Sequence, residues 1–227
     1  MNITKQELDN RLKLMRQKMF QNSLDGLIIF SDEYRSGNST YFTNYKPINV
    51  IEESPQLITL VKNEDPVVFI GRLNAYAAQD KIPIADVRSI SEIESQIGSV
   101  FSSISNDKSR IGIIGDNLLP IKIFDSIKNV LTDVEYVECG HLLSDIRSIK
   151  SDSEIKLLSK AASINDYVLS QIVDKCEVGM TEIQIAAEAE YIGRKLGSDL
   201  GSATVIMSGP NTNYPAWRPS NRKIEEG

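Results

Sequence analysis

Histidine, cysteine and tryptophan are scarce in this sequence, which has 1 His, 2 Cys and 1 Trp in 227 residues. The single histidine, His141, excludes a metal site built from several histidines of one chain. A nucleophile that needs a histidine base would have to use this residue. Because His141 follows an extended run and opens a short helical one, we expect an ordinary residue at a turn or helix start instead.

The sequence lacks the features that are typical of nucleic-acid-binding, membrane-bound and secreted proteins. The formal net charge is −6 and no basic patch is visible, so we expect no nucleic-acid partner. No apolar run approaches membrane-spanning length, and the first residues have no apolar signal segment, so we expect neither a membrane partner nor secretion. Cys139 and Cys176 have neither metal-like nor C-x-x-C spacing. We therefore expect reduced thiols and a cytoplasmic location.

The first part of the chain alternates helical and extended patterns. Thr4 and Glu7 form a potential capping box before an apolar helical face made of Leu8, Leu12, Met15 and Met19. Further helices are predicted at 73–79, 90–104 and 121–131, and strands at 27–30, 57–61, 67–70, 110–116 and 134–137. Residues 31–40 are predicted to be turn-rich. This alternation predicts an α/β domain whose sheet is flanked by helices.

Two glycines in the 110–116 strand invite a nucleotide-binding interpretation. Gly112 and Gly115 have G-x-x-G spacing, whereas the dinucleotide fingerprint requires G-x-G-x-x-G. We interpret the pair as one glycine for close strand packing and one for a turn.

After residue 144 the pattern changes to two capped helices and one strand. Ser151 and Glu154 begin a helix that extends to about residue 176, and Thr181 and Gln184 begin another over 182–196. A strand is predicted at 203–207. We therefore predict two domains, 1–144 and 145–227. The second contains too little structure to enclose a core of its own, so we expect self-association or marginal stability.

Four short motifs in the second part resemble the opening of the catalytic domain of the creatinase/prolidase/aminopeptidase P family. Residues 147–155 read Arg-Ser-Ile-Lys-Ser-Asp-Ser-Glu-Ile, residues 179–182 read Gly-Met-Thr-Glu, residues 208–215 read Ser-Gly-Pro-Asn-Thr-Asn-Tyr-Pro, and residues 222–227 read Arg-Lys-Ile-Glu-Glu-Gly. Residues 1–144 resemble the family's N-terminal domain, with fewer sharp motifs. The resemblance covers essentially the whole chain.

The resemblance implies a creatinase-like α/β domain with a mixed sheet, followed by the first part of an α+β pita-bread catalytic domain. It implies a metal-dependent hydrolase similar to Xaa-Pro dipeptidase or aminopeptidase P, a homodimer acting on a peptide or small amide-like substrate. Family members bind two divalent ions, manganese, cobalt or zinc, through two Asp, one His and two Glu that follow the position of Gly227. We therefore assign no catalytic residue, metal ligand or cofactor to this chain, and expect no hydrolysis by it alone.

The resemblance also draws attention to the loop near the end of the chain. Family peptidases carry a histidine after the loop proline, and Ala216 stands there in this sequence. Alanine cannot donate a hydrogen bond to a developing oxyanion, which favours members that act on creatine, ectoine or sulfonium compounds. We single out Tyr214, Trp217 and Arg218 as candidate substrate-binding residues. The alternative is a loop that packs against the first domain.

Two other groups of residues can each be interpreted in two ways. Tyr41, Phe42 and Tyr45 resemble the family segment that reaches a neighbouring subunit's active site, although an aromatic cluster is also typical of a core. Glu225 and Glu226 are interpreted as solvated surface charge rather than as ligands. A non-catalytic relative that dimerises or binds a small ligand stays open as a second function.

Overall fold

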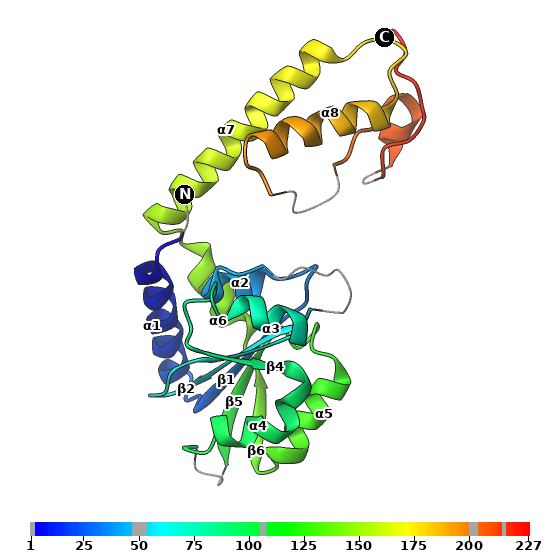
Figure 1. Cartoon of the computed structure of the whole chain (residues 1–227). Coiled ribbons are helices and arrows are strands. Elements are labelled where there is room, and N and C mark those ends of the chain that lie inside the picture. The colour runs from blue at the N-terminus through cyan, green and yellow to red at the C-terminus, as the bar shows by residue number, and fades with distance from the viewer. Residues whose placement is uncertain (1–2, 47–53, 105–107, 200–203, 215–216) are drawn as a thin grey trace. The chain divides into compact units, whose positions relative to one another are not determined.

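The computed structural model describes residues 3–46, 54–104, 108–199, 204–214 and 217–227. The chain divides into two compact units, Met1–Lys150 and Ser151–Gly227 (Figure 1). The predicted division at residue 145 falls inside α6 (Gly140–Ser148), which belongs to the first unit. None of the described helices combines the length and the hydropathy that crossing a membrane requires.

The first unit is built on one mixed sheet, in which six described strands follow the order β4-β3-β2-β1-β5-β6. The strands are β1 (Gly26–Ser31), β2 (Gln56–Val61), β3 (Val67–Ile70), β4 (Asp86–Ser89), β5 (Ser109–Ile114) and β6 (Val134–Glu138). β1 pairs antiparallel with β2 and parallel with β5, β2 pairs antiparallel with β3, and the outer pairs are parallel. This confirms the predicted mixed sheet.

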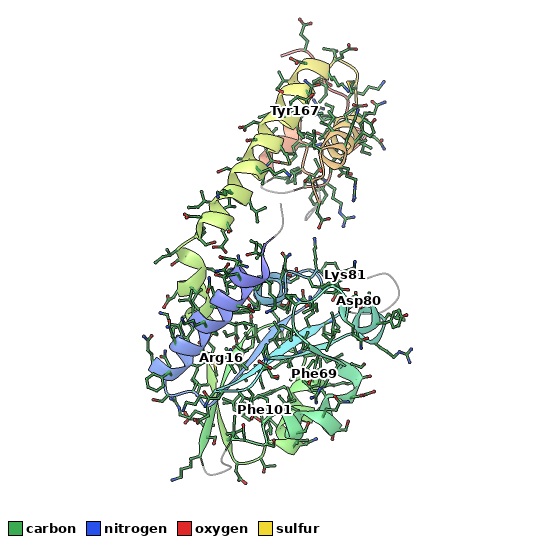
Figure 2. All side chains as sticks on the ribbon, turned by 60° about the vertical axis from the view of Figure 1, so that its left-hand side comes forward. Arg16, Phe69, Asp80, Lys81, Phe101 and Tyr167 are labelled. Atoms are coloured by element: carbon green, nitrogen blue, oxygen red, sulfur yellow. The ribbon has the colours of Figure 1, made fainter. Side chains whose placement is uncertain are left out.

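Helices cover both faces of this sheet, which is why β1, β2 and β3 are mostly apolar and buried along their whole length rather than alternating. The helices of the unit are α1 (Lys5–Gln21), α2 (Gly37–Thr43), α3 (Arg72–Ala78), the 3₁₀ turn η1 (Ile90–Glu92), α4 (Ile93–Val100), α5 (Ile121–Val130) and α6. One core joins side chains of α1, α2, α3 and α6 to the sheet. A second core lies under α4 and α5 and includes Phe69 and Phe101 (Figure 2).

The predicted face of α1 is confirmed, since Leu8, Leu12, Met15 and Met19 are all buried. Thr4 caps the helix by accepting the N–H of Glu7 at 3.2 Å. The reciprocal half of the predicted capping box is replaced by an ion pair: the Glu7 carboxylate contacts Arg11 at 3.2 Å.

The aromatic cluster predicted near a loop lies partly on a helix. Tyr41 and Phe42 belong to α2, within a segment whose first part was predicted to be turn-rich. Phe42 is fully buried, and Tyr41 and Tyr45 pack against the same core. Arg11 donates to the carbonyl of Tyr41 at 2.8 Å and lies over its ring. These contacts support the core interpretation of the cluster.

The middle of the first unit differs from the sequence prediction in the bounds of one helix and in one strand that was not predicted. The helix predicted over 90–104 ends at Val100 and begins with the 3₁₀ turn η1. Strand β4 was missed because it is a four-residue edge strand with charged and polar side chains, Asp-Val-Arg-Ser, all of them half-buried. Edge strands commonly carry charge, so their apolar pattern is weak.

Gly112 in β5 and Gly115 in the turn that follows have the roles predicted for them. A Cβ on Gly112 would lie 2.6 Å from the Cys139 sulfur and 2.8 Å from Leu27, so this position needs the space. Gly115 has φ +83°, and a Cβ there would lie 2.4 Å from the carbonyl oxygen of Phe30. The G-x-x-G pattern is therefore explained by packing and turn geometry.

The second unit contains α7 (Asp152–Lys175), α8 (Glu182–Lys195) and the 3₁₀ turn η2 (Gly209–Asn213). Both predicted capping boxes are present, Ser151 with Glu154 and Thr181 with Gln184. No side chain of α7 is buried, and its apolar residues Ile155, Leu158, Tyr167, Leu169 and Val173 are exposed (Tyr167 is labelled in Figure 2). The helices pack together, but they cover little apolar surface.

The strand predicted at 203–207 is not formed by residues 204–207, and Ala203 lies outside the described residues. A strand needs a neighbour that satisfies its N–H and C=O groups. In the described residues of this unit, β pairing is limited to the isolated bridge between Thr181 and Lys223. The β-branched residues of 204–207 consequently favour an extended backbone but have no neighbouring strand to pair with in the described part of this unit.

Candidate functional site

A buried carboxylate organises the end of the second unit. Glu182 is the first residue of α8 and is fully buried. Its Oε1 accepts the backbone N–H of Ser208 at 2.7 Å and the Ser208 hydroxyl at 2.8 Å. Its Oε2 accepts the N–H of Ser220 at 3.0 Å and the Ser220 hydroxyl at 2.7 Å. The side-chain amide of Asn211 donates to both oxygens at 3.1 Å.

These donors keep the carboxylate charged. Burial by itself raises the pKa of Glu182, but the hydrogen bonds from Ser220, Ser208 and Asn211 outweigh burial and lower the pKa to about 2. The residue also lies at the positive end of the helix dipole of α8. Glu182 is therefore an ionised hydrogen-bond acceptor at neutral pH rather than a group that exchanges protons there.

Backbone hydrogen bonds hold the same region together from the other side. The first N–H groups of a helix have no partner inside it. At α8, Glu182 donates its N–H to the carbonyl of Arg222 at 3.1 Å, and Ile183 donates to the carbonyl of Ser220 at 3.2 Å. The turn before the helix is also paired, with Gly179 donating to Ile224 at 2.9 Å. The segment around 220–224 is thus fixed against the start of α8.

Together these contacts define a loop of residues 208–220, called here the 208–220 loop. Ser208 and Asn211 near its beginning and Ser220 at its end all bind the single carboxylate of Glu182. Ser208 is followed by η2, in which Pro210 is near the first position, where its missing N–H costs nothing. The loop is therefore closed at its base.

The structure brings together two of the three predicted substrate-binding residues. The rings of Tyr214 and Trp217 have centroids 5.8 Å apart with an interplanar angle of 36°. Tyr214 is 54% exposed and Trp217 59% exposed, so the pair presents apolar ring surface to solvent. Arg218 follows Trp217 in the chain and is also exposed. Ala216, the position where family peptidases have histidine, lies outside the described residues.

A metal site does not emerge from the described side chains. They include no group of three or more His, Cys, Asp or Glu residues arranged to hold an ion. Glu225 is exposed and pairs with Arg222 at 3.0 Å, and Glu226 is exposed beside it. These residues do not fit the dinuclear centre that the family resemblance implies, because such a centre needs several converging oxygen ligands.

The structure shows where the single histidine and the two cysteines lie. His141 is the second residue of α6 and is exposed, as expected for a helix-start residue. Cys139 is buried, and burial, helped by Glu138, raises the pKa of its thiol to about 12. Its sulfur lies 3.4 Å from the carbonyl oxygen of Ile113. Cys176 is exposed.

Sequence reasoning missed the role of Glu182. The residue was visible only as the last letter of the Gly-Met-Thr-Glu helix start. An acidic residue in the first turn of a helix is ordinarily explained by the helix dipole and solvent exposure. The clue available in the sequence was Ser208, Asn211 and Ser220, three hydrogen-bond donors grouped in one loop, but nothing local shows that they share one acceptor.

Comparison with known proteins identifies the class. The family model of the Creatinase/Prolidase N-terminal domain matches residues 11–149, and that of Metallopeptidase family M24 matches residues 156–227. Together the matches span both units of the structure. The chain therefore belongs to the creatinase/prolidase family.

Individual relatives agree with this. The chain is 24% identical over 226 residues to the Xaa-Pro dipeptidase of Pyrococcus horikoshii, covering 97% of this chain and 58% of the relative. It is 27% identical over 222 residues to the uncharacterized peptidase YqhT of Bacillus subtilis, covering 96% and 58%. The chain thus spans under two thirds of the length of these relatives.

Solved structures show the same fold. The prolidase of Pyrococcus horikoshii aligns with a TM-score of 0.75 at 22% identity, over 96% of this chain and 58% of that one. The X-Pro aminopeptidase of Thermotoga maritima aligns with a TM-score of 0.76 at 18% identity, over 95% and 58%. The expected creatinase-like α/β domain is confirmed by this likeness.

Proposed function

We propose that this chain is part of a metal-dependent hydrolase that cleaves Xaa-Pro dipeptides or a closely related small amide. The two family matches follow one another in the order of such an enzyme. The relative from Pyrococcus horikoshii is named as an Xaa-Pro dipeptidase. The proposal also includes a cytoplasmic location and a homodimer; sedimentation at several protein concentrations would test the dimer, and cell fractionation would test the location.

The observation that supports a peptide substrate best is the exposed aromatic pair on the 208–220 loop. Tyr214 and Trp217 offer a flat apolar surface, and a prolyl ring is a compact apolar group suited to such a surface. Arg218, the exposed residue after Trp217 in the chain, offers a guanidinium, which suits the free carboxylate of a dipeptide. The three residues together match the ring and the carboxylate of the proline, the C-terminal residue of an Xaa-Pro dipeptide.

This chain's role in the proposed reaction is substrate binding. In the family, two divalent ions, manganese, cobalt or zinc, supply the hydrolytic chemistry. The described residues do not fit that centre, so no chemical step is assigned to them. Their contribution is to hold the substrate's ring and carboxylate in a fixed orientation, which lowers the entropic cost of reaction.

A second candidate function rests on Ala216. Because alanine replaces the histidine of family peptidases, the parent enzyme would act on a non-peptide substrate such as creatine or ectoine. A non-catalytic relative that dimerises or binds a small ligand is the third candidate. The substrates differ enough for one binding experiment to separate these functions.

The experiment uses the single tryptophan, Trp217, as a probe. Ala-Pro is titrated into the 227-residue chain while its tryptophan emission is recorded, with Ala-Ala and creatine as comparison ligands. We expect Ala-Pro to give a saturable change, and Arg218→Gln to weaken it about ten-fold by removing a charge-assisted contact. Arg194→Gln, at an exposed position on α8, is the matched control.

The other outcomes have defined meanings. A saturable response to creatine but not to Ala-Pro would favour the non-peptide enzyme. No response to any ligand would favour the non-catalytic relative. Sequencing the gene on both sides of the region encoding these residues tests the metal part independently, because the proposal requires two Asp, one His and two Glu at family spacing.

A further inference from the structure

One side chain, that of Glu182, accepts most of the side-chain hydrogen bonds that close the 208–220 loop, and Asn211 adds a direct bond to the Ser220 hydroxyl at 3.2 Å. Ser208, Asn211 and Ser220 each donate to the Glu182 carboxylate, which is fully buried. The aromatic pair lies between these anchor points in the sequence. Tyr214 follows Asn211 closely, and Trp217 precedes Ser220.

We propose that Glu182 is the positioning residue of the 208–220 loop, holding Tyr214 and Trp217 where they meet the substrate. The inference rests on the proposed function for the identity of the substrate, and on the hydrogen-bond geometry for the positioning itself. Glu182 does not touch the substrate. It acts by joining the beginning and the end of the loop.

The geometry requires a carboxylate rather than any polar group. Each Glu182 oxygen accepts one backbone N–H, from Ser208 on Oε1 and from Ser220 on Oε2. A backbone N–H can only donate, whereas the serine hydroxyls can rotate and accept. An amide at position 182 would therefore place its NH₂ group against one of the two backbone donors in either orientation. Only a group with two acceptor atoms satisfies both ends of the loop.

The arrangement also explains why helix stability is not the main role of Glu182. The N-terminus of α8 already has a complete capping box, with Thr181 and Gln184 exchanging hydrogen bonds at 2.8 and 3.2 Å. The N–H groups of Glu182 and Ile183 are satisfied by backbone carbonyls. The Glu182 side chain is therefore not needed to cap the helix, and its hydrogen bonds go to residues of the loop.

The test compares Glu182→Gln with Glu188→Gln in the 227-residue chain. Glu188 lies on the same helix and forms an exposed ion pair with Lys175, so its substitution makes the same charge change away from the loop. Amide hydrogen exchange is measured at Ser208 and Ser220, together with the rotational mobility of Trp217 and the affinity for Ala-Pro. We expect about ten-fold faster exchange and a more mobile Trp217 in Glu182→Gln, with Glu188→Gln unchanged.

The readouts separate the positioning role from the proposed function. Faster exchange with weaker Ala-Pro binding supports both. Faster exchange and a mobile Trp217, with no Ala-Pro binding even in the unaltered chain, supports the positioning role and contradicts the peptide substrate. Unchanged exchange at both serines and an unchanged Trp217 in a folded Glu182→Gln chain overturns the inference.

Milder variants keep the test decisive if Glu182→Gln does not fold. Ser208→Ala and Ser220→Ala each remove one hydroxyl donor to Glu182 and leave the backbone N–H in place. Ser220→Ala also removes the acceptor of hydrogen bonds from Asn211 and from the N–H of Arg222. We expect Ser208→Ala to speed amide exchange of the loop about three-fold, because one neutral donor is lost, and Ser220→Ala to speed it at least as much. Exposed Ser163→Ala on α7 is the control. Equal exchange in Ser208→Ala, Ser220→Ala and the control would also overturn the inference.

Discussion

The guanidinium of Arg222 packs directly against Gly209, so that a Cβ on this glycine would lie 2.5 Å from Arg222 Nη2. Gly209 also has φ +46°, a conformation that costs an L-residue energy. Arg222 pairs in turn with Glu225 at 3.0 Å. The start of the 208–220 loop is therefore constrained both by its backbone and by a neighbouring side chain.

Gly209→Ala is expected to destabilise the second unit by about 2 kcal/mol, through the positive φ and displacement of Arg222. Gly197→Ala is the matched control, because Gly197 has φ +84° but no atom within 4 Å of an added Cβ. Its expected cost is about 1 kcal/mol. Urea unfolding followed by Trp217 emission measures both. Equal costs would show that the contact with Arg222 is unimportant.

The stability of the second unit is expected to depend on acid through Glu182. Its pKa is lowered from 4.5 to about 2 in the folded protein, where burial is outweighed by hydrogen bonds from Ser220, Ser208 and Asn211. Its stabilising contribution is thus fully present above pH about 4.5 and is lost as the pH falls towards 2. Urea unfolding between pH 7 and pH 2 should show this loss.

The same titration of Glu182→Gln provides the control for this prediction. Without the ionisable group, the part of the acid dependence that arises from Glu182 should disappear, while the remaining carboxylates still titrate. Parallel acid profiles for the two proteins would contradict the assignment.

Phe42→Ala is expected to destabilise the first unit by about 3–5 kcal/mol, since it deletes a fully buried ring from a packed core. Phe20 is 74% exposed and lies on α1 of the same unit, so Phe20→Ala should change stability by less than about 0.5 kcal/mol. Thermal unfolding monitored by circular dichroism compares them. A small effect of Phe42→Ala would count against the core position of α2.

The two cysteines are expected to differ in reactivity with a thiol reagent. Cys176 is exposed, whereas burial and the nearby Glu138 charge raise the pKa of the Cys139 thiol to about 12. At pH 8 the native protein should therefore react at one thiol per chain, and at two after denaturation. Cys176→Ser should abolish the native reaction. Fast labelling of two thiols in native protein would contradict the buried position of Cys139.

Local patterns were sufficient for much of the architecture. The mostly apolar runs at 27–30, 57–61 and 67–70 predicted strands, and the structure has β1, β2 and β3 there. Ser151 with Glu154 and Thr181 with Gln184 predicted two helix starts correctly, because a capping box involves neighbours only three residues apart. The family resemblance, too, came from short motifs and is confirmed by the family matches.

Features that depend on distant partners were decided by the tertiary structure. Residues 204–207 have strand propensity, but no strand forms there because the described part of the second unit provides no pairing neighbour. Strand β4 forms despite a polar sequence because β3 offers it an edge.

The candidate site shows the same division. Tyr214 and Trp217 were selected from the sequence, and the structure brings their rings into contact, while their role in substrate binding stays a prediction. Glu182 was read from sequence only as part of a helix start. Its importance comes from burial and from donors that lie 26 to 38 residues away in the chain. The sequence by itself determined which residues could donate and accept, whereas only the tertiary structure decided that Glu182, removed from water, would be the acceptor they share.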